Sequence, residues 1–206
     1  MRRIIVKLLK KPIFSLYKLN IDPKNRQAFL TEGMNNLITS HRNEMGTLMM
    51  CATHEDEAGS VNYIFEMYRD EASYQIHAGS PQFQRYAEFA QKVVQSKEIH
   101  KLNLEMIQTN DQALEIKGEN PYFARLLEVT TDYSKLETLK NISRDTIASF
   151  VSNTDPGHWV IIDIFQNKST MKKENISQQL SKISTEYSIH ELDIDTMVNQ
   201  ASLKLE

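Results

Sequence analysis

The first half of the chain alternates between segments with the periodicity of strands and segments with the periodicity of helices. Apolar side chains recur at every second position in a half-buried strand, and three or four positions apart in an amphipathic helix. Strand character is found at 13–21, 47–54, 61–69 and 99–108, and helical spacing at 23–41, 70–77 and 81–94. With the short 70–77 segment set aside, the order strand-helix-strand-strand-helix-strand predicts a ferredoxin-like α+β unit over residues 12–108.

Capping residues mark where the predicted helices begin. Asp22-Pro23 and Ser80-Pro81 each place a side chain that caps a helix before a proline at its first position. Asp70 has the same capping role before the short helix that ends at His77. These signals support three helices in the first half of the chain.

A second unit with the same order follows a polar stretch. Residues 109–120 are mostly polar and contain Gly118, which predicts a linker. Beyond it, strands are predicted at 122–130, 147–152, 158–166 and 187–194, and helices at 132–144 and 169–184. The second, degenerate ferredoxin-like unit therefore spans 121–194, and the tail after it has no strong periodicity.

The third strands of the two units match residue by residue. When 63–70 is aligned with 160–167, Glu66 meets Asp163 and an aromatic residue follows two positions later in both copies. Side chains alternate between the two faces of a strand, and one face of this strand is apolar in both copies. That face consists of Tyr63, Phe65 and Met67 in the first copy and of Val160, Ile162 and Ile164 in the second. We expect helices to cover it.

The opposite face of the same strand is mixed in character. It carries Asn62, Glu66 and Tyr68 in the first copy. A polar and aromatic face that is repeated in both units predicts the lining of a semi-polar space between two sheets.

Composition excludes several classes of protein. The chain of 206 residues is 40% hydrophobic and 25% charged, as in ordinary soluble proteins with a core. Its net charge of −3 is too small to indicate a nucleic-acid or membrane partner. The single cysteine, Cys51, excludes an intrachain disulfide and is typical of a reducing compartment, which predicts a cytoplasmic protein.

The basic N-terminal segment predicts no export signal and no membrane span. Its apolar run at 4–6 is interrupted by Lys7 and is too short for either role. Residues 4–9 instead have the spacing of a short helix, which Pro12 would end.

One run of residues resembles a known family. Glu44-Met45-Gly46-Thr47-Leu48, followed by Glu66-x-Tyr68-x-Asp70-x-x-x-Tyr74-x-x-His77, is similar to the antibiotic biosynthesis monooxygenase family of small ferredoxin-like domains. Domains of this family pair through their open sheet faces into a dimeric α+β barrel. The resemblance therefore implies two antiparallel sheets packed face to face as a pseudo-dimer within one chain. A further homodimer is compatible with it.

The same resemblance implies an activity and a site. Members of this kind are cofactor-independent monooxygenases that use molecular oxygen on electron-rich aromatic molecules such as quinols. Such a site needs a group that promotes deprotonation of the substrate and a pocket that excludes water. By resemblance, His77 would be catalytic and Asn62, Glu66 and Tyr68 would bind the substrate. Glu174 takes the place of His77 in the second unit, which implies one functional pocket per chain.

Structural interpretations of the same residues stay open. His77 is also explained by capping of its short helix, or by an interaction with the helix dipole. Glu66 and Asp163 are equally well explained by ion pairs at the rim of a sheet. The other histidines show no spacing typical of metal ligands, so no metal site and no cofactor are predicted. Haem-degrading members of the family carry a tryptophan where this chain has Tyr68.

Two other functions compete with the monooxygenase. The first is a non-catalytic protein that binds a small ligand or is associated with stress, because the fold alone does not confer activity. The second is an isomerase of a small signalling metabolite, in which His77 would move a proton.

Overall fold

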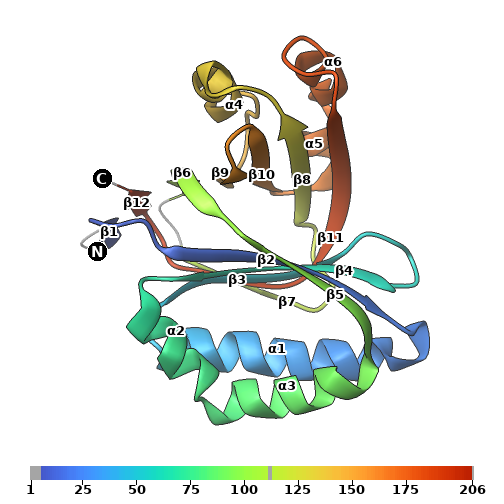
Figure 1. The fold of residues 1–206 in the computed structure, drawn as a ribbon. Coiled ribbons are helices and arrows are strands. Elements are labelled where there is room, and N and C mark those ends of the chain that lie inside the picture. The colour runs from blue at the N-terminus through green and yellow to red at the C-terminus, as the bar shows by residue number, and fades with distance from the viewer. Residues whose placement is uncertain (1–5, 111–112, 206) are drawn as a thin grey trace.

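The computed structural model describes residues 6–110 and 113–205, and it confirms the α+β architecture (Figure 1). The first half follows the predicted order, with a short 3-10 turn, η1 (Pro23–Asn25), at the start of the first helix. Its elements are β2 (Ile13–Ile21), α1 (Arg26–Asn43), β3 (Thr47–His54), β4 (Val61–Tyr68), α2 (Glu71–Ala78), α3 (Pro81–Val93) and β5 (Val94–Lys101).

The predicted caps form in the structure. Asp70 accepts a hydrogen bond from the backbone N–H of Ser73 at 2.8 Å, and Ser80 accepts one from the N–H of Phe83 at 3.4 Å. Each cap satisfies a backbone N–H in the first turn that has no partner within the helix.

The second half repeats the order with shorter helices. The first half ends with β6 (Asn103–Thr109). The elements that follow are β7 (Leu114–Lys117), β8 (Phe123–Thr130), η2 (Tyr133–Lys135), α4 (Leu136–Lys140), β9 (Ala148–Asp155), β10 (His158–Phe165), α5 (Lys168–Lys172), α6 (Ile176–Leu180), β11 (Tyr187–Asn199) and β12 (Leu203–Leu205). The single helix predicted over 169–184 is wrong, because Asn175 caps a new helix, α6, after α5 has ended. The helix predicted over 132–144 is likewise reduced to η2 and α4.

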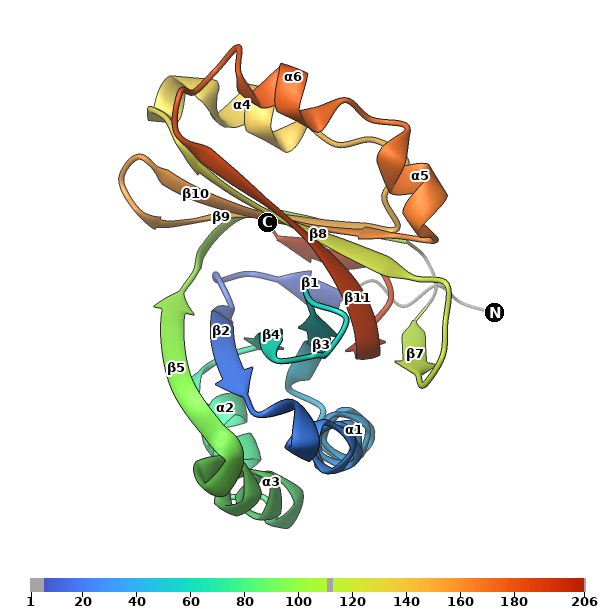
Figure 2. The same ribbon diagram turned by 90° about the vertical axis from the view of Figure 1, so that its right-hand side faces the viewer.

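The strands close into one barrel. They are hydrogen-bonded in the order β5-β2-β4-β3-β11-β8-β10-β9-β6, and β5 and β6 are separated along the chain by Leu102 alone. The two ends of the sheet are therefore consecutive segments of one strand. β11 crosses between the halves in a similar way, since it pairs with β8 through its first part and with β3 through its last part (Figure 2).

The two sheets face each other across an apolar core, as predicted. The core contains Tyr63, Phe65 and Met67 together with Val160, Ile162 and Ile164. Our assignment of these residues to the helix-covered face is therefore wrong. The interior of this closed barrel is filled with packed side chains, so the residues that face it are apolar. The uniformly apolar face of β4 and β10 is therefore the face that lines the barrel interior.

The mixed face of β4 points outward, to the layer between the sheet and the helices. There Ile64 packs with Phe29 of α1 and Tyr86 of α3, and Tyr68 packs with Leu37 of α1. Asn62, Glu66 and Tyr68 thus lie in this layer and not in the barrel interior. Figure 1 shows α1, α2 and α3 covering this side of the sheet. Helices of the second half, α4, α5 and α6, lie on the far side of the barrel (Figure 2).

The chain ends differ from the prediction. β1 (Val6–Leu8) pairs in parallel with β12, so residues 6–8 form a strand where a helix was predicted. Residues 4 and 5 of that predicted helix lie outside the described residues. The tail is also ordered into strands, because β11 continues to Asn199 and β12 follows it. β7 lies within the predicted linker and pairs with β11.

No helix in the described part of the chain is both long enough and apolar enough to cross a membrane.

Candidate functional site

A cavity of about 370 Å³ lies between the first sheet and its helices. Its walls come from β2, β4 and β5 on the sheet side and from α2 and α3 on the helix side. Small-molecule sites in proteins have volumes of about 300–1,000 Å³ and combine apolar walls with a few polar groups. This cavity has that character, because aromatic and aliphatic side chains surround one carboxyl group, that of Glu66.

The cavity is graded from a buried floor to an exposed mouth. Glu66, Ile64 and Tyr86 are buried at its floor, whereas Lys97 and Ile99 are exposed at its mouth. A ligand would enter past β5 and reach Glu66 last.

Glu66 is the buried acid of this site. Its residue is 6% exposed, and the Tyr68 hydroxyl donates a hydrogen bond to its Oε2 at 3.0 Å. No other described residue donates a hydrogen bond to this carboxyl group. Burial raises the pKa of Glu66, against the opposing effects of His77, Tyr68 and Lys97. The result is a carboxylate with more base strength than usual.

Two tyrosine hydroxyls accompany Glu66. The Tyr86 hydroxyl is buried and has no hydrogen-bond partner among the described residues. Burial raises the pKa of Tyr86, and burial together with the Glu66 charge raises the pKa of Tyr17. Both groups therefore stay protonated near neutral pH and can donate to a ligand oxygen.

His77 lies behind the cavity wall. It is fully buried at the end of α2, and its Nδ1 is 3.1 Å from Oε2 of Glu44. Its ring centroid is 4.7 Å from that of Phe83 and 5.1 Å from that of Tyr68. Phe83 lines the cavity and His77 does not. Its Nε2 is buried without a partner among the described residues.

Glu44 anchors this histidine. Burial alone would raise the pKa of Glu44, but hydrogen bonds from His77 and Thr47 hold that pKa below its usual value. Glu44 is therefore ionised and can only accept, so Nδ1 of His77 is the donor of the hydrogen bond between them. The contact fixes the orientation of the imidazole.

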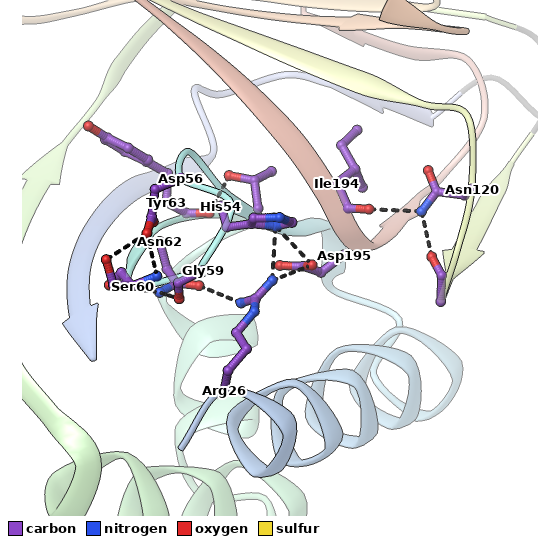
Figure 3. A network of polar contacts seen from close by, with 12 residues as sticks. Arg26, His54, Asp56, Gly59, Ser60, Asn62, Tyr63, Asn120, Ile194 and Asp195 are labelled. Atoms are coloured by element: carbon purple, nitrogen blue, oxygen red, sulfur yellow. Dashed lines mark hydrogen bonds and ion pairs between the residues drawn. The ribbon is translucent and has the colours of Figure 1, made fainter. Parts of the chain in front are cut away.

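Asn62 belongs to a different network, shown in Figure 3. Its Oδ1 accepts a hydrogen bond from Arg26 at 2.7 Å, and Arg26 also donates to Asp195 at 2.6 Å. The Asn62 amide nitrogen donates to the carbonyl of Gly59 at 3.0 Å. Gly59 has a φ of +64°, and a Cβ there would come within 2.2 Å of the Arg26 side chain, so this turn requires glycine.

The predicted site residues are thus only partly brought together. Glu66 and Tyr68 are hydrogen-bonded to each other, and His77 packs against Tyr68. Asn62 does not line the cavity. The roles predicted for these residues remain predictions.

Several lining residues were not singled out from the sequence. They are Tyr86 on α3, Tyr17 on β2 and Lys97 on β5. The signal for them is the strand register, in which Tyr17 stands beside both Ile64 and Ile99, and Leu19 beside Lys97. That register is set by contacts between distant strands.

The equivalent layer of the second half holds no such acid. Asp163 is fully buried, but Arg125 lies 3.2 Å from it, and Ser149 donates to it at 2.8 Å. Arg125 also pairs with Glu174 at 2.6 Å. Asp163 therefore forms the ion pair that the structural interpretation predicted, but the pair is buried and does not lie at the rim of a sheet. No basic side chain among the described residues forms an ion pair with Glu66.

Two other kinds of site, a second ligand groove and a metal site, receive no support from the structure. A larger groove of about 790 Å³ runs between α1, β11 and the segment before β8. The Asp195 side chain in this groove already pairs with His54 and with Arg26. Within the described residues, no three histidine, cysteine or acidic side chains form a group that could hold a metal ion.

Sequence comparison points to one family. A sequence model described as antibiotic biosynthesis monooxygenase matches residues 12–88 of the chain. A candidate antibiotic biosynthesis monooxygenase from Bacteroides thetaiotaomicron has 30% sequence identity to the chain over 43% of this chain and 85% of that one, with a TM-score of 0.42. No curated protein matches the chain.

Two solved structures resemble the chain over nearly its whole length. A candidate monooxygenase from Lactobacillus acidophilus NCFM has a TM-score of 0.79 at 19% identity, and the match covers 96% of this chain and 100% of that one. A candidate monooxygenase from Fusobacterium nucleatum has a TM-score of 0.82 at 13% identity, over 94% of this chain and 97% of that one. At these identities the likeness shows a shared fold.

Proposed function

Because the chain belongs to the antibiotic biosynthesis monooxygenase family, we propose that it is a cofactor-independent monooxygenase of a small electron-rich aromatic molecule such as a quinol. The observation that carries this proposal is the unpaired buried carboxyl of Glu66 at the floor of an aromatic cavity. We propose a cytoplasmic location as well, in keeping with the single free Cys51.

The reaction needs little from the protein beyond a base and a dry pocket. Deprotonation turns a phenol into an electron-rich phenolate, which passes one electron to oxygen. The resulting radical and superoxide combine into a peroxide anion at a ring carbon, and return of the abstracted proton makes this a hydroperoxide. Loss of water from this hydroperoxide leaves a carbonyl group, so the substrate supplies all four electrons, and one oxygen atom leaves as water.

In this proposal Glu66 accepts the phenolic proton. A carboxyl with a raised pKa is better matched to proton transfer near neutral pH than an ordinary one. Tyr68 holds one carboxyl oxygen through its hydroxyl, so the orientation of the group is fixed before the substrate binds. Tyr86 offers a second hydrogen bond to the developing phenolate, because its hydroxyl is unpartnered.

We propose His77 as a positioning residue for this site. It packs against Tyr68, which holds Glu66, and against Phe83, which forms part of the wall. Its link to Glu44 fixes its own ring. A direct proton transfer between His77 and a ligand in the cavity receives no support from this geometry, because His77 does not line the cavity.

Oxygen consumption tests the proposal. The purified protein is mixed with a panel of quinols and other phenols, and uptake is followed with an oxygen electrode. We expect Glu66→Gln to lower turnover about 10²–10⁴-fold on any active compound, as removal of a general base does. Glu88→Gln, an exposed change on α3 outside the cavity, should leave turnover unchanged.

The same experiment separates the competing functions. Binding of a phenol without oxygen uptake would support the binding protein. A product of unchanged mass without oxygen uptake would support the isomerase. Full activity of Glu66→Gln would remove Glu66 as the base.

A further inference from the structure

Lys97 stands at the mouth of the cavity with its charge available. It is exposed on β5, and its Nζ lies 5.3 Å from the centre of the Tyr17 ring, which forms part of the wall. Among the described lining residues it is the only basic one, and no ion pair to it is found among described residues. The cation is thus held against an aromatic wall and has no acidic partner to neutralise it.

The cavity has a cation at one end and a buried carboxyl group at the other. Lys97 pairs across the strands with Leu19 of β2, whose other neighbour is on β4, the strand that bears Glu66. Two strand spacings separate β5 from β4, which is about 10 Å. An anionic group on a ligand is therefore attracted to the mouth, and its burial beside the carboxyl group at the floor is unfavourable. This difference orients any ligand that has one anionic end.

The floor has hydrogen-bonding groups for a neutral hydroxyl. Glu66 can accept a hydrogen bond, and the buried Tyr86 hydroxyl has no partner among the described residues. A buried polar group without a partner costs free energy, which a ligand hydroxyl would recover. The apolar side chains of Leu19, Ile64 and Phe83 between the two ends suit an aromatic ring.

We infer that the cavity binds a phenol that carries a carboxylate substituent, with the phenolic hydroxyl at Glu66 and Tyr86 and the carboxylate at Lys97. The inference concerns what binds, and it rests on the proposed function only in taking this cavity as the substrate site. Lys97 is then the residue that selects acidic phenols over neutral ones.

A matched pair of ligands tests the inference. Calorimetry compares the binding of 3-(4-hydroxyphenyl)propionate with that of its primary amide, which has the same size and no charge. We expect the wild-type protein to bind the acid about three- to fivefold more tightly than the amide, the effect of one partly exposed ion pair. In Lys97→Glu this preference should be reversed, while amide binding is kept.

Lys92→Glu is the control, because it makes the same charge change on the exposed face of α3 outside the cavity. It should keep the preference for the acid. Equal binding of acid and amide by the wild-type protein, binding of neither, or equal effects of the two variants would overturn the inference. Oxygen uptake measured on the same samples separates the two proposals. Binding of the acid that depends on Lys97, without uptake on any phenol, contradicts the monooxygenase and leaves the inference standing.

Discussion

The two halves of the barrel place a buried acid at the same position and treat it in opposite ways. Glu66 on β4 has Ser15 as its neighbour on the adjacent strand, and its carboxyl is held by one tyrosine hydroxyl. Asp163 on β10 has Arg125 as the corresponding neighbour, and Arg125 also binds Glu174. A single cross-strand residue thus decides whether the acid is free for a ligand or neutralised.

The helices differ in the same sense. In the first half, α3 has 13 residues and forms one wall of a cavity with the sheet. In the second half, α5 and α6 have five residues each, and Glu174 between them reaches down to Arg125. The comparison indicates that the candidate site belongs to the first half alone, while both halves contribute strands to the barrel.

The ion pair of the second half gives the largest expected effect. Arg125→Met removes the cation between two buried or nearly buried acids, and loss of one partner of a buried pair costs about 3–5 kcal/mol. The free energy of unfolding from urea denaturation measures this loss. The exposed pair between Arg85 and Glu32 is the control, since Arg85→Met should cost no more than about 1 kcal/mol. Equal losses would show that Arg125 is not the neutralising residue.

His77 should matter for stability as well as for activity. Capping of a short helix or an interaction with its dipole would not require burial of this histidine, but the side chain is fully buried. His77→Ala is therefore expected to lower the free energy of unfolding by about 2–4 kcal/mol, the range of large-to-small changes in a core. His77→Gln, which keeps a hydrogen bond to Glu44, should recover part of this loss and part of the turnover. A loss below 1 kcal/mol, an outcome typical of surface changes, would contradict the packing described.

The comparison can also be reversed by exchange of one residue. Ser15→Arg places beside Glu66 the cation that Asp163 already has, and an adjacent cation lowers a carboxyl pKa by about 1–3 units. Glu66 then becomes a weaker base, so turnover on an active phenol should fall about tenfold or more. Unchanged turnover would show that the activity does not depend on the absence of a cation beside Glu66. Ser15→Ala is the control for loss of the hydroxyl.

The smallest effect is expected where the halves meet at the end of the barrel. His190 of β11 lies 2.7 Å from Glu55 and 3.4 Å from Glu128. Its hydrogen bond with Glu128, supported by Glu55, raises the pKa of His190 above its usual value. A raised pKa means that the folded state holds the proton more tightly. The stabilisation is therefore complete below the ordinary histidine pKa of about 6.5, and it is lost as pH rises through the folded-state value.

Removal of this contact should change the pH dependence of stability. The free energy of unfolding of the wild-type protein should exceed that of His190→Gln by about 0.5 kcal/mol near pH 6, with the difference vanishing at higher pH. Urea denaturation at several pH values measures it. A difference that grows as pH rises would contradict the assignment.

The order of elements was predictable from the sequence, but the orientation of the faces was not. The alternation in β4 and β10 identified both strands and aligned Glu66 with Asp163. In a barrel covered by helices both faces of a strand are buried, so an apolar face does not show which side the helices take. The polar residues marked the helix-covered side because a cavity remains there, whereas the interior is filled.

Only those site residues that lie on the same strand could be predicted to meet from the sequence. Glu66 and Tyr68 are two positions apart on one strand, so their meeting follows from local geometry. Tyr17 and Lys97 join them through the register of three strands, and Tyr86 joins them through the packing of a helix. Arg125 was not foreseen for the same reason, since its partner Asp163 is on another strand.

The continuous strand formed by β5 and β6 has a consequence for how the chain could be divided. Each half lends a strand segment to the sheet of the other, through β6 in one direction and β11 in the other. A protease cut just before β7 would therefore release no independent domain. The two fragments would remain interlocked by main-chain hydrogen bonds and melt in a single transition. As one intact chain, the barrel also closes without a second subunit, so its closure does not depend on protein concentration.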